Sequence, residues 1–183
     1  MKRFIPIVAL ASVLFPGDGP TALAAQTGPE RVQAPSSPTP KRQLSGPRFG
    51  FTVFTGSVAD QRIAADREPL ISQFGWQWET QIMATEDGGQ ALMEWVLLAG
   101  GLEQSEFALS LGWLTGYRLS SGVEFGVGPN FSVNKDNTSP TTSMQVAGGA
   151  TMPFGELQIP VNLSLGIAKG GPRFTTLLGW IVG

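Results

Sequence analysis

Five charged residues stand in segments that otherwise alternate between large apolar and small polar side chains, namely Glu79, Glu94, Arg118, Glu124 and Arg173. Two of them, Glu79 and Glu94, are carboxylates of the kind that can act as a general acid and a general base. Charges of both signs on one face also suit a binding site in an enclosed interior. Because a buried charge persists only when it is paired or solvated, we favour a third interpretation, a structural salt-bridge network of Arg118, Glu124, Glu79 and Glu94.

Arg118 and Glu124 flank a turn signal, Ser120-Ser121-Gly122, at equal distances. In a simple hairpin, two residues placed in this way lie directly opposite each other on neighbouring strands. The spacing therefore predicts a cross-strand ion pair between Arg118 and Glu124.

The chain contains neither cysteine nor histidine. Thiolate nucleophiles, the usual base of a catalytic triad and most zinc ligand sets are therefore excluded. Gly126 and Gly128 lack the third glycine of a dinucleotide-binding fingerprint, and Lys169-Gly170-Gly171 lacks the spacing of a phosphate-binding loop. With a formal net charge of -2 and no basic run interleaved with aromatics, no nucleic-acid partner is expected. We predict a non-enzymatic protein with no catalytic residue, cofactor or metal ligand.

Apolar residues recur at every second position from Phe49 onward, which is typical of strands with two unlike faces. In residues 73–82, one face carries Trp76 and Trp78, and the other carries Gln77 and Glu79. The same division predicts eight strands, at 49–55, 73–82, 91–98, 107–118, 123–134, 143–152, 157–167 and 174–182.

The composition of the two faces indicates which one lies inside. The polar face consists mainly of Gly, Ser, Asn, Gln and Ala, whereas a water-facing surface normally carries many Lys and Glu. Only 14% of the residues are charged, and the apolar face is continuous from strand to strand. We therefore predict an all-β fold, a single antiparallel up-and-down β-barrel of about eight strands over residues 47–183, with its apolar face in a bacterial outer membrane. The five tryptophans are expected in lipid or at its interface, namely Trp76, Trp78, Trp95, Trp113 and Trp180.

Membrane barrels have short periplasmic turns and longer outer loops. With the N-terminus on the periplasmic side, the turns at 120–122 and 153–155 are short inner turns, and the connections at 57–69 and 134–141 are longer outer ones. The expected role is structural or surface-interacting, through those outer loops. The alternative is a soluble periplasmic barrel that binds a small apolar ligand in its interior.

Two prolines lie inside predicted strands, Pro129 and Pro160. Proline has no backbone N–H and so removes one hydrogen bond from a ladder. We predict a bulge or a locally frayed pair of strands at each.

The N-terminal segment has the features of an export signal. Lys2 and Arg3 precede an apolar stretch, and Ala22-Leu23-Ala24 forms a small-x-small cleavage pattern. We expect residues 1–25 to be removed as a signal peptide. Residues 26–46 are rich in Pro and Ser and nearly free of large apolar residues, which predicts a flexible leader.

Three segments, 72–79, 94–104 and 124–130, resemble an uncharacterised family of exported bacterial proteins. The resemblance implies no activity. In architecture the chain is similar to small OmpA-like and OmpX-like barrels, which implies the lipid bilayer and the barrel assembly machinery as partners. That machinery commonly reads a terminal aromatic residue, and here Trp180 is close to the end without being terminal.

Overall fold

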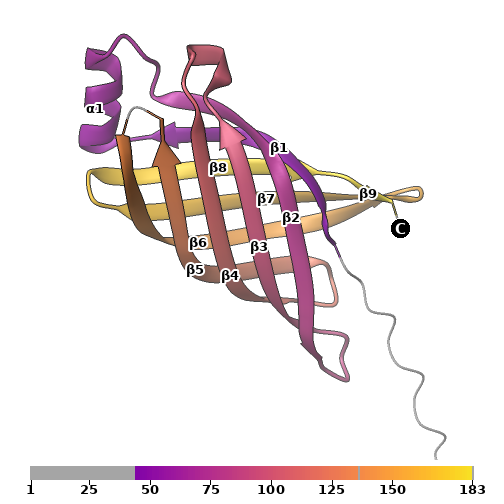
Figure 1. Ribbon diagram of the computed structural model, residues 1–183. Helices are drawn as coiled ribbons and strands as arrows, with labels where there is room; N and C mark the ends of the chain where they lie inside the picture. The colour runs from indigo at the N-terminus through magenta and orange to yellow at the C-terminus, as the bar shows by residue number, and fades with distance from the viewer. Residues whose placement is uncertain (1–43, 136, 183) are drawn as a thin grey trace, which may run out of the picture. The chain divides into compact units, whose positions relative to one another are not determined.

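A computed structural model describes residues 44–135 and 137–182, which form a β-barrel (Figure 1). Each of the eight long strands pairs antiparallel with the next, and β1 pairs with β8 to close the barrel. The predicted all-β up-and-down fold is confirmed. The elements are β1 (Gly46–Phe54), α1 (Gly56–Ala64), β2 (Leu70–Ala84), β3 (Gln90–Gly100), the 3-10 helix η1 (Leu102–Gln104), β4 (Ala108–Arg118), β5 (Val123–Asn134), β6 (Asn137–Phe154), β7 (Leu157–Ala168), β8 (Gly171–Gly179) and β9 (Ile181–Val182).

The connections gather at two ends of the barrel. One end, here called the α1 end, holds α1, η1 and the turns β5–β6 and β7–β8 (Figure 1). The other, the Leu44 end, holds the start of β1 and the turns β2–β3, β4–β5 and β6–β7. The interior is therefore bounded by two ends with different connections.

The predicted division of the two faces is confirmed by burial. Trp76 and Trp78 are exposed on the outside of the barrel, whereas Gln77 and Glu79 of the same strand are buried. The interior is nevertheless less polar than predicted, because it also contains a small apolar cluster of Val96, Leu98, Leu114 and Leu177. Residues 91–98 carry apolar side chains on both faces, so the alternation pattern alone could not show which of these side chains point inward.

Two inward-facing positions can be occupied only by glycine, because the backbone of the adjacent strand leaves no room for a Cβ atom. A Cβ built at Gly75 would lie 1.8 Å from the carbonyl oxygen of Leu97 on β3, and one at Gly50 would lie 1.8 Å from that of Thr176 on β8. In both cases the clashing carbonyl belongs to the adjacent strand and not to the opposite side of the barrel. They therefore permit a close approach of adjacent backbones, which a side chain would prevent.

The connection at 57–69, predicted as a loop, contains the helix α1. The N-cap residue, Thr55, makes no side-chain capping hydrogen bond within the described residues. A helix of nine residues is only marginally stable by itself. Contacts with the barrel stabilise it, since Val58 N–H donates to Gly170 O at 3.1 Å. Within the described residues, no helix is sufficiently long and apolar to cross a membrane.

The prediction of a long outer connection at 134–141 is wrong. β6 begins at Asn137 and pairs there with Asn134, so the two strands continue almost to the turn. The register shifts between Ser132 and Asn134, which marks an irregularity at this end of β5. The start of β6 has the polar composition of a loop, but backbone pairing with β5 keeps it in a strand.

At each strand proline the ladder is interrupted on one side only, since Pro129 still pairs with Met144 and Pro160 with Thr151, both on β6. Pairing of β4 with β5 passes from Gly112–Asn130 to Thr115–Val127, without a bridge at Pro129. β7 pairs with β9 up to Gln158 and with β8 only from Val161, on either side of Pro160. The predicted local fraying is confirmed. The predicted strand at 174–182 is accordingly divided into β8 and β9 by Trp180.

The described barrel begins slightly before the predicted boundary. β1 starts at Gly46, and Leu44 is 2% exposed. The last residues of the predicted leader therefore belong to the barrel. The predicted signal peptide and residues 26–43 lie outside the described residues.

Candidate functional site

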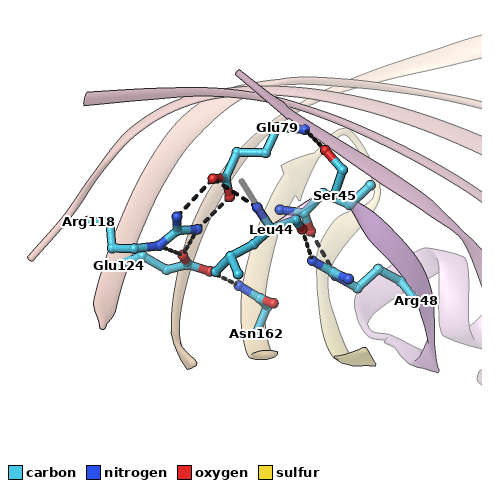
Figure 2. Close-up of polar contacts among 8 residues, drawn as sticks. Leu44, Ser45, Arg48, Glu79, Arg118, Glu124 and Asn162 are labelled. Carbon is cyan, nitrogen blue, oxygen red and sulfur yellow. Dashed lines mark hydrogen bonds and ion pairs between the residues drawn. The ribbon is translucent and has the colours of Figure 1, made fainter. Parts of the chain in front are cut away.

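A cluster of buried charges fills the interior near the Leu44 end, with Arg118 at its centre (Figure 2). Arg118 Nη1 donates to Glu79 Oε1 at 2.8 Å and Arg118 Nη2 to Glu79 Oε2 at 2.5 Å. Nε and Nη2 both donate to Glu124 Oε2, at 2.8 and 2.6 Å. One guanidinium therefore binds two carboxylates, and all three residues are at most 6% exposed.

Strand register explains how these residues meet. Arg118 and Glu124 are direct partners in the β4–β5 ladder, so the ion pair predicted across the turn is present. Glu79 lies on β2, two strands from β4, and is the register partner of Glu94 on β3. Arg118 thus reaches past β3, a contact that hairpin spacing does not reveal.

Leu44, Ser45 and Arg48, among the first described residues, contribute further contacts (Figure 2). Leu44 N–H donates to Glu79 Oε1 at 3.3 Å, and Glu79 N–H donates to Ser45 Oγ at 2.9 Å. Arg48 Nη2 donates to Leu44 O at 2.9 Å, and Arg48 Nε donates to Gln77 Oε1 at 3.0 Å. Sequence reasoning missed Arg48, although it falls on the same strand face as Gly50 and Thr52, where an inward residue is expected.

Glu94 differs from the other two carboxylates. Oxygen atoms of Glu79, Glu94 and Glu124 lie within 4.8 Å of one another, a spacing at which carboxylates hold metal ions. Arg118 already binds Glu79 and Glu124, so a guanidinium occupies the cationic position between them. Asn162 Nδ2 also donates to Glu124 Oε1, at 2.6 Å. Among the described residues, none forms a hydrogen bond or salt bridge with Glu94.

A cavity of about 570 Å³ extends from Glu94 through the interior to the α1 end. Its walls combine polar side chains, such as Gln73, Asn130 and Gln145, with the apolar cluster around Leu98. Residues of α1 form part of its boundary. A volume of this size is in the range of small-molecule binding sites.

Arg173, predicted to face inward, lines this cavity near the α1 end. Its Nη1 donates to Ser132 Oγ at 3.0 Å, and its guanidinium carbon lies 5.9 Å from the centre of the Phe54 ring. Arg173 is therefore separate from the cluster around Arg118. The sequence placed all five charges inside but did not divide them between the two ends.

A second ion pair, which the sequence did not reveal, holds α1 against the barrel. Arg62 Nη2 lies 2.7 Å from Glu106 Oε2, and the side chains are 9% and 1% exposed. Arg62 Nε donates to Glu68 O at 2.9 Å, and the Arg62 guanidinium carbon lies 4.8 Å from the Phe54 ring centre. Asn134 Nδ2 also donates to Glu106. Arg62 and Glu106 stand 44 positions apart, so no local spacing signals the pair.

Glu103 attaches η1 to β2 at the same end. Ser72 N–H and Ser72 Oγ donate to its carboxylate at 2.8 and 2.7 Å. Partial burial raises the pKa of Glu103, but these two hydrogen bonds favour the ionised form, and the net pKa lies below its usual range. The α1 end is therefore held together by charged and polar contacts.

Comparisons with protein-family models, with curated proteins and with solved structures found no match. The resemblance to a family of exported proteins thus stays a prediction. The architecture, an eight-stranded closed antiparallel barrel, is compatible with small outer-membrane barrels.

Proposed function

We propose that this protein is a non-enzymatic outer-membrane β-barrel with a structural or surface-interaction role. One observation carries the proposal. All charged residues of the described strands lie on the inward side, namely Arg48, Glu79, Glu94, Arg118, Glu124 and Arg173. A barrel surface without charge is suited to hydrocarbon and poorly suited to water.

The side chains on that surface support the same proposal. We define the outer belt as exposed apolar side chains found on every long strand, including Phe49, Phe51, Phe74, Trp76, Trp78, Trp95, Leu109, Trp113, Phe125, Val127, Phe131, Met144, Val146, Leu163, Ile167 and Phe174. A soluble monomer rarely exposes an apolar surface that surrounds the whole molecule. Aromatic rings in the belt also suit the interface between hydrocarbon and headgroups.

The soluble periplasmic alternative has one observation in its favour, the interior cavity, which resembles the ligand space of soluble barrels. It requires, however, that the charge-free outer belt face water. We therefore prefer the membrane proposal. In the proposed orientation the Leu44 end is periplasmic, and the α1 end presents α1 and η1 as contact surfaces.

An outward charge distinguishes the two proposals. Val127 lies near the middle of β5 and is 51% exposed. In a bilayer, Val127→Arg should cost about 2–4 kcal/mol of folding free energy, because a cation is moved into hydrocarbon. On a water-facing surface the same change should cost within about 0.5 kcal/mol. Denaturant titration of the mature chain refolded into liposomes measures this difference.

Ile63→Arg is the matched control, since Ile63 is 59% exposed on α1, outside the barrel wall. It should have little effect in either case. Cell fractionation of the unaltered protein completes the test, with recovery in outer membranes and dependence on detergent expected. A detergent-free soluble monomer, with Val127→Arg as harmless as Ile63→Arg, would refute the membrane proposal.

A further inference from the structure

We propose that the interior cavity binds a small organic cation with an apolar body, whose ammonium group contacts Glu94. This inference goes beyond a structural or surface-interaction role and does not depend on whether the outer belt lies in lipid. It follows from the position of Glu94, a carboxylate with no hydrogen bond or salt bridge among the described residues, at the inner end of an amphipathic cavity.

The charged residues near Glu94 already have hydrogen-bond partners of their own. Both oxygens of Glu79 accept bonds from Arg118, which also binds Glu124. Arg48 donates to Gln77 and to two backbone carbonyls. No described residue donates to Glu94, although it borders the cavity and keeps intermediate exposure. A ligand with N–H donors would supply the partner that the chain does not provide.

A second acceptor lies at the same end. Asn162 Oδ1 is enclosed and has no hydrogen-bond partner among the described residues, while its Nδ2 donates to Glu124. Asn162 and Glu94 both line the cavity. The Glu94 carboxylate lines the cavity and, when ionised, only accepts hydrogen bonds, which matches a group with several donors and no acceptor, and an ammonium has that character.

The residues of the cavity wall next to Glu94 indicate the chemistry of the rest of the ligand. The apolar cluster of Val96, Leu98, Leu114 and Leu177 is buried between Glu94 and the α1 end, and three of these side chains come from the neighbouring strands β3 and β4. The polar side chains of β5 and β6, such as Asn130 and Gln145, also line the cavity. An apolar body of a few carbon atoms would be buried along the apolar cluster.

An anionic ligand fits less well. Its head group would bind near Arg173, which already contacts Ser132 and the Phe54 ring. An apolar tail directed inward from Arg173 would then end against Glu94 and two further carboxylates. Leaving these polar groups beside hydrocarbon is unfavourable. The other basic residues of the cavity wall, Arg62, Arg67 and Lys169, belong to the α1 end as Arg173 does, so the end at Glu94 favours a cation over an anion of equal length.

The test uses isothermal titration of the full mature chain with hexylammonium, hexanol and hexanoate, in lipid nanodiscs if the chain is recovered with membranes and in buffer if it is recovered as a soluble monomer. Hexylammonium should bind most tightly. Glu94→Gln keeps the shape of the side chain but removes its charge, so it should weaken hexylammonium binding by about tenfold or more and leave hexanol unchanged. Glu156→Gln is the matched control, because Glu156 is exposed in the β6–β7 turn and should not affect binding.

A second variant tests the location. A Cβ built at Gly112 meets no atom closer than 3.5 Å and points toward Asn130, Gln145 and Val96. Gly112→Phe should therefore fill the cavity and abolish binding of hexylammonium and hexanol alike, while the fold persists by circular dichroism. Tighter binding of hexanoate, equal binding by Glu94→Gln, or no saturable binding above empty nanodiscs or buffer alone would each overturn the proposal.

Discussion

Arg118 is the residue on which the interior charge balance depends. Its guanidinium contacts Glu79 and Glu124 at 2.5 and 2.6 Å, and the side chains of all three residues are at most 7% exposed. Desolvation makes such a cluster costly to form, and the attraction between its members offsets that cost only when every member is present. The cluster therefore acts as a unit.

Replacing Arg118 alone should be more harmful than neutralising the whole cluster. Arg118→Met leaves two buried carboxylates without their cation and should lower the free energy of unfolding by about 3–5 kcal/mol. The triple variant Arg118→Met, Glu79→Gln, Glu124→Gln removes the stranded charges and should be the more stable of the two. Denaturant titration of refolded protein measures both. If the effects of the single variants simply add in the triple variant, the three residues are not coupled.

At the scale of elements, α1 is held to the barrel by one buried ion pair and by contacts such as that of Val58 N–H with Gly170 O. Arg62 joins it to Glu106 at the start of β4, to Glu68 O and to the Phe54 ring. The helix is short and has no side-chain N-cap bond, so local interactions contribute little to its stability. Its stability therefore comes mainly from the barrel.

Arg62→Ala should release α1 without unfolding the barrel. We expect the hydrogen-exchange protection of amides in α1 to fall by about tenfold or more, while amides of β3 and β4 keep theirs, because the opening is local. Arg67→Ala is the control, since Arg67 is 3.9 Å from Glu106 and its side chain is 29% exposed. Equal protection in the two variants would mean that the Arg62–Glu106 pair does not anchor the helix.

At the scale of the whole molecule, the arrangement of charges opposes a continuous channel. An eight-stranded barrel has an interior only just wide enough for its own side chains. The cavity of about 570 Å³ occupies the part toward the α1 end, whereas Arg118, Glu79, Glu124 and Leu44 fill the part toward the Leu44 end. The interior of the described barrel is therefore a cavity closed by a polar cluster.

Purified protein in planar bilayers should accordingly show no steady conductance above baseline. The reason is steric, because the buried cluster at the Leu44 end leaves no continuous path for hydrated ions. Stable, reproducible channel openings would contradict this expectation. If those openings disappeared when Arg118 or Glu79 was altered, the protein would have a transport function in place of a structural one.

The sequence by itself determined the strands, their two faces and the Arg118–Glu124 pair. These features are local. Alternation has a period of two residues within one strand, and a short turn sets the register of the residues on either side of it. The inward charges could be identified for the same reason, since each shares a face with small polar neighbours.

Only the tertiary structure decided which of those charges meet. Arg118 and Glu79 are 39 positions apart, and they are brought together by the order of strands across β3. The Arg62–Glu106 pair, the separation of Arg173 from the cluster and the lack of a hydrogen bond to Glu94 within the described part of the chain likewise depend on how the closed barrel brings distant strands and α1 together. The physical reason is that alternation specifies which face a side chain occupies, whereas pairing and closure of the strands specify its neighbours on that face.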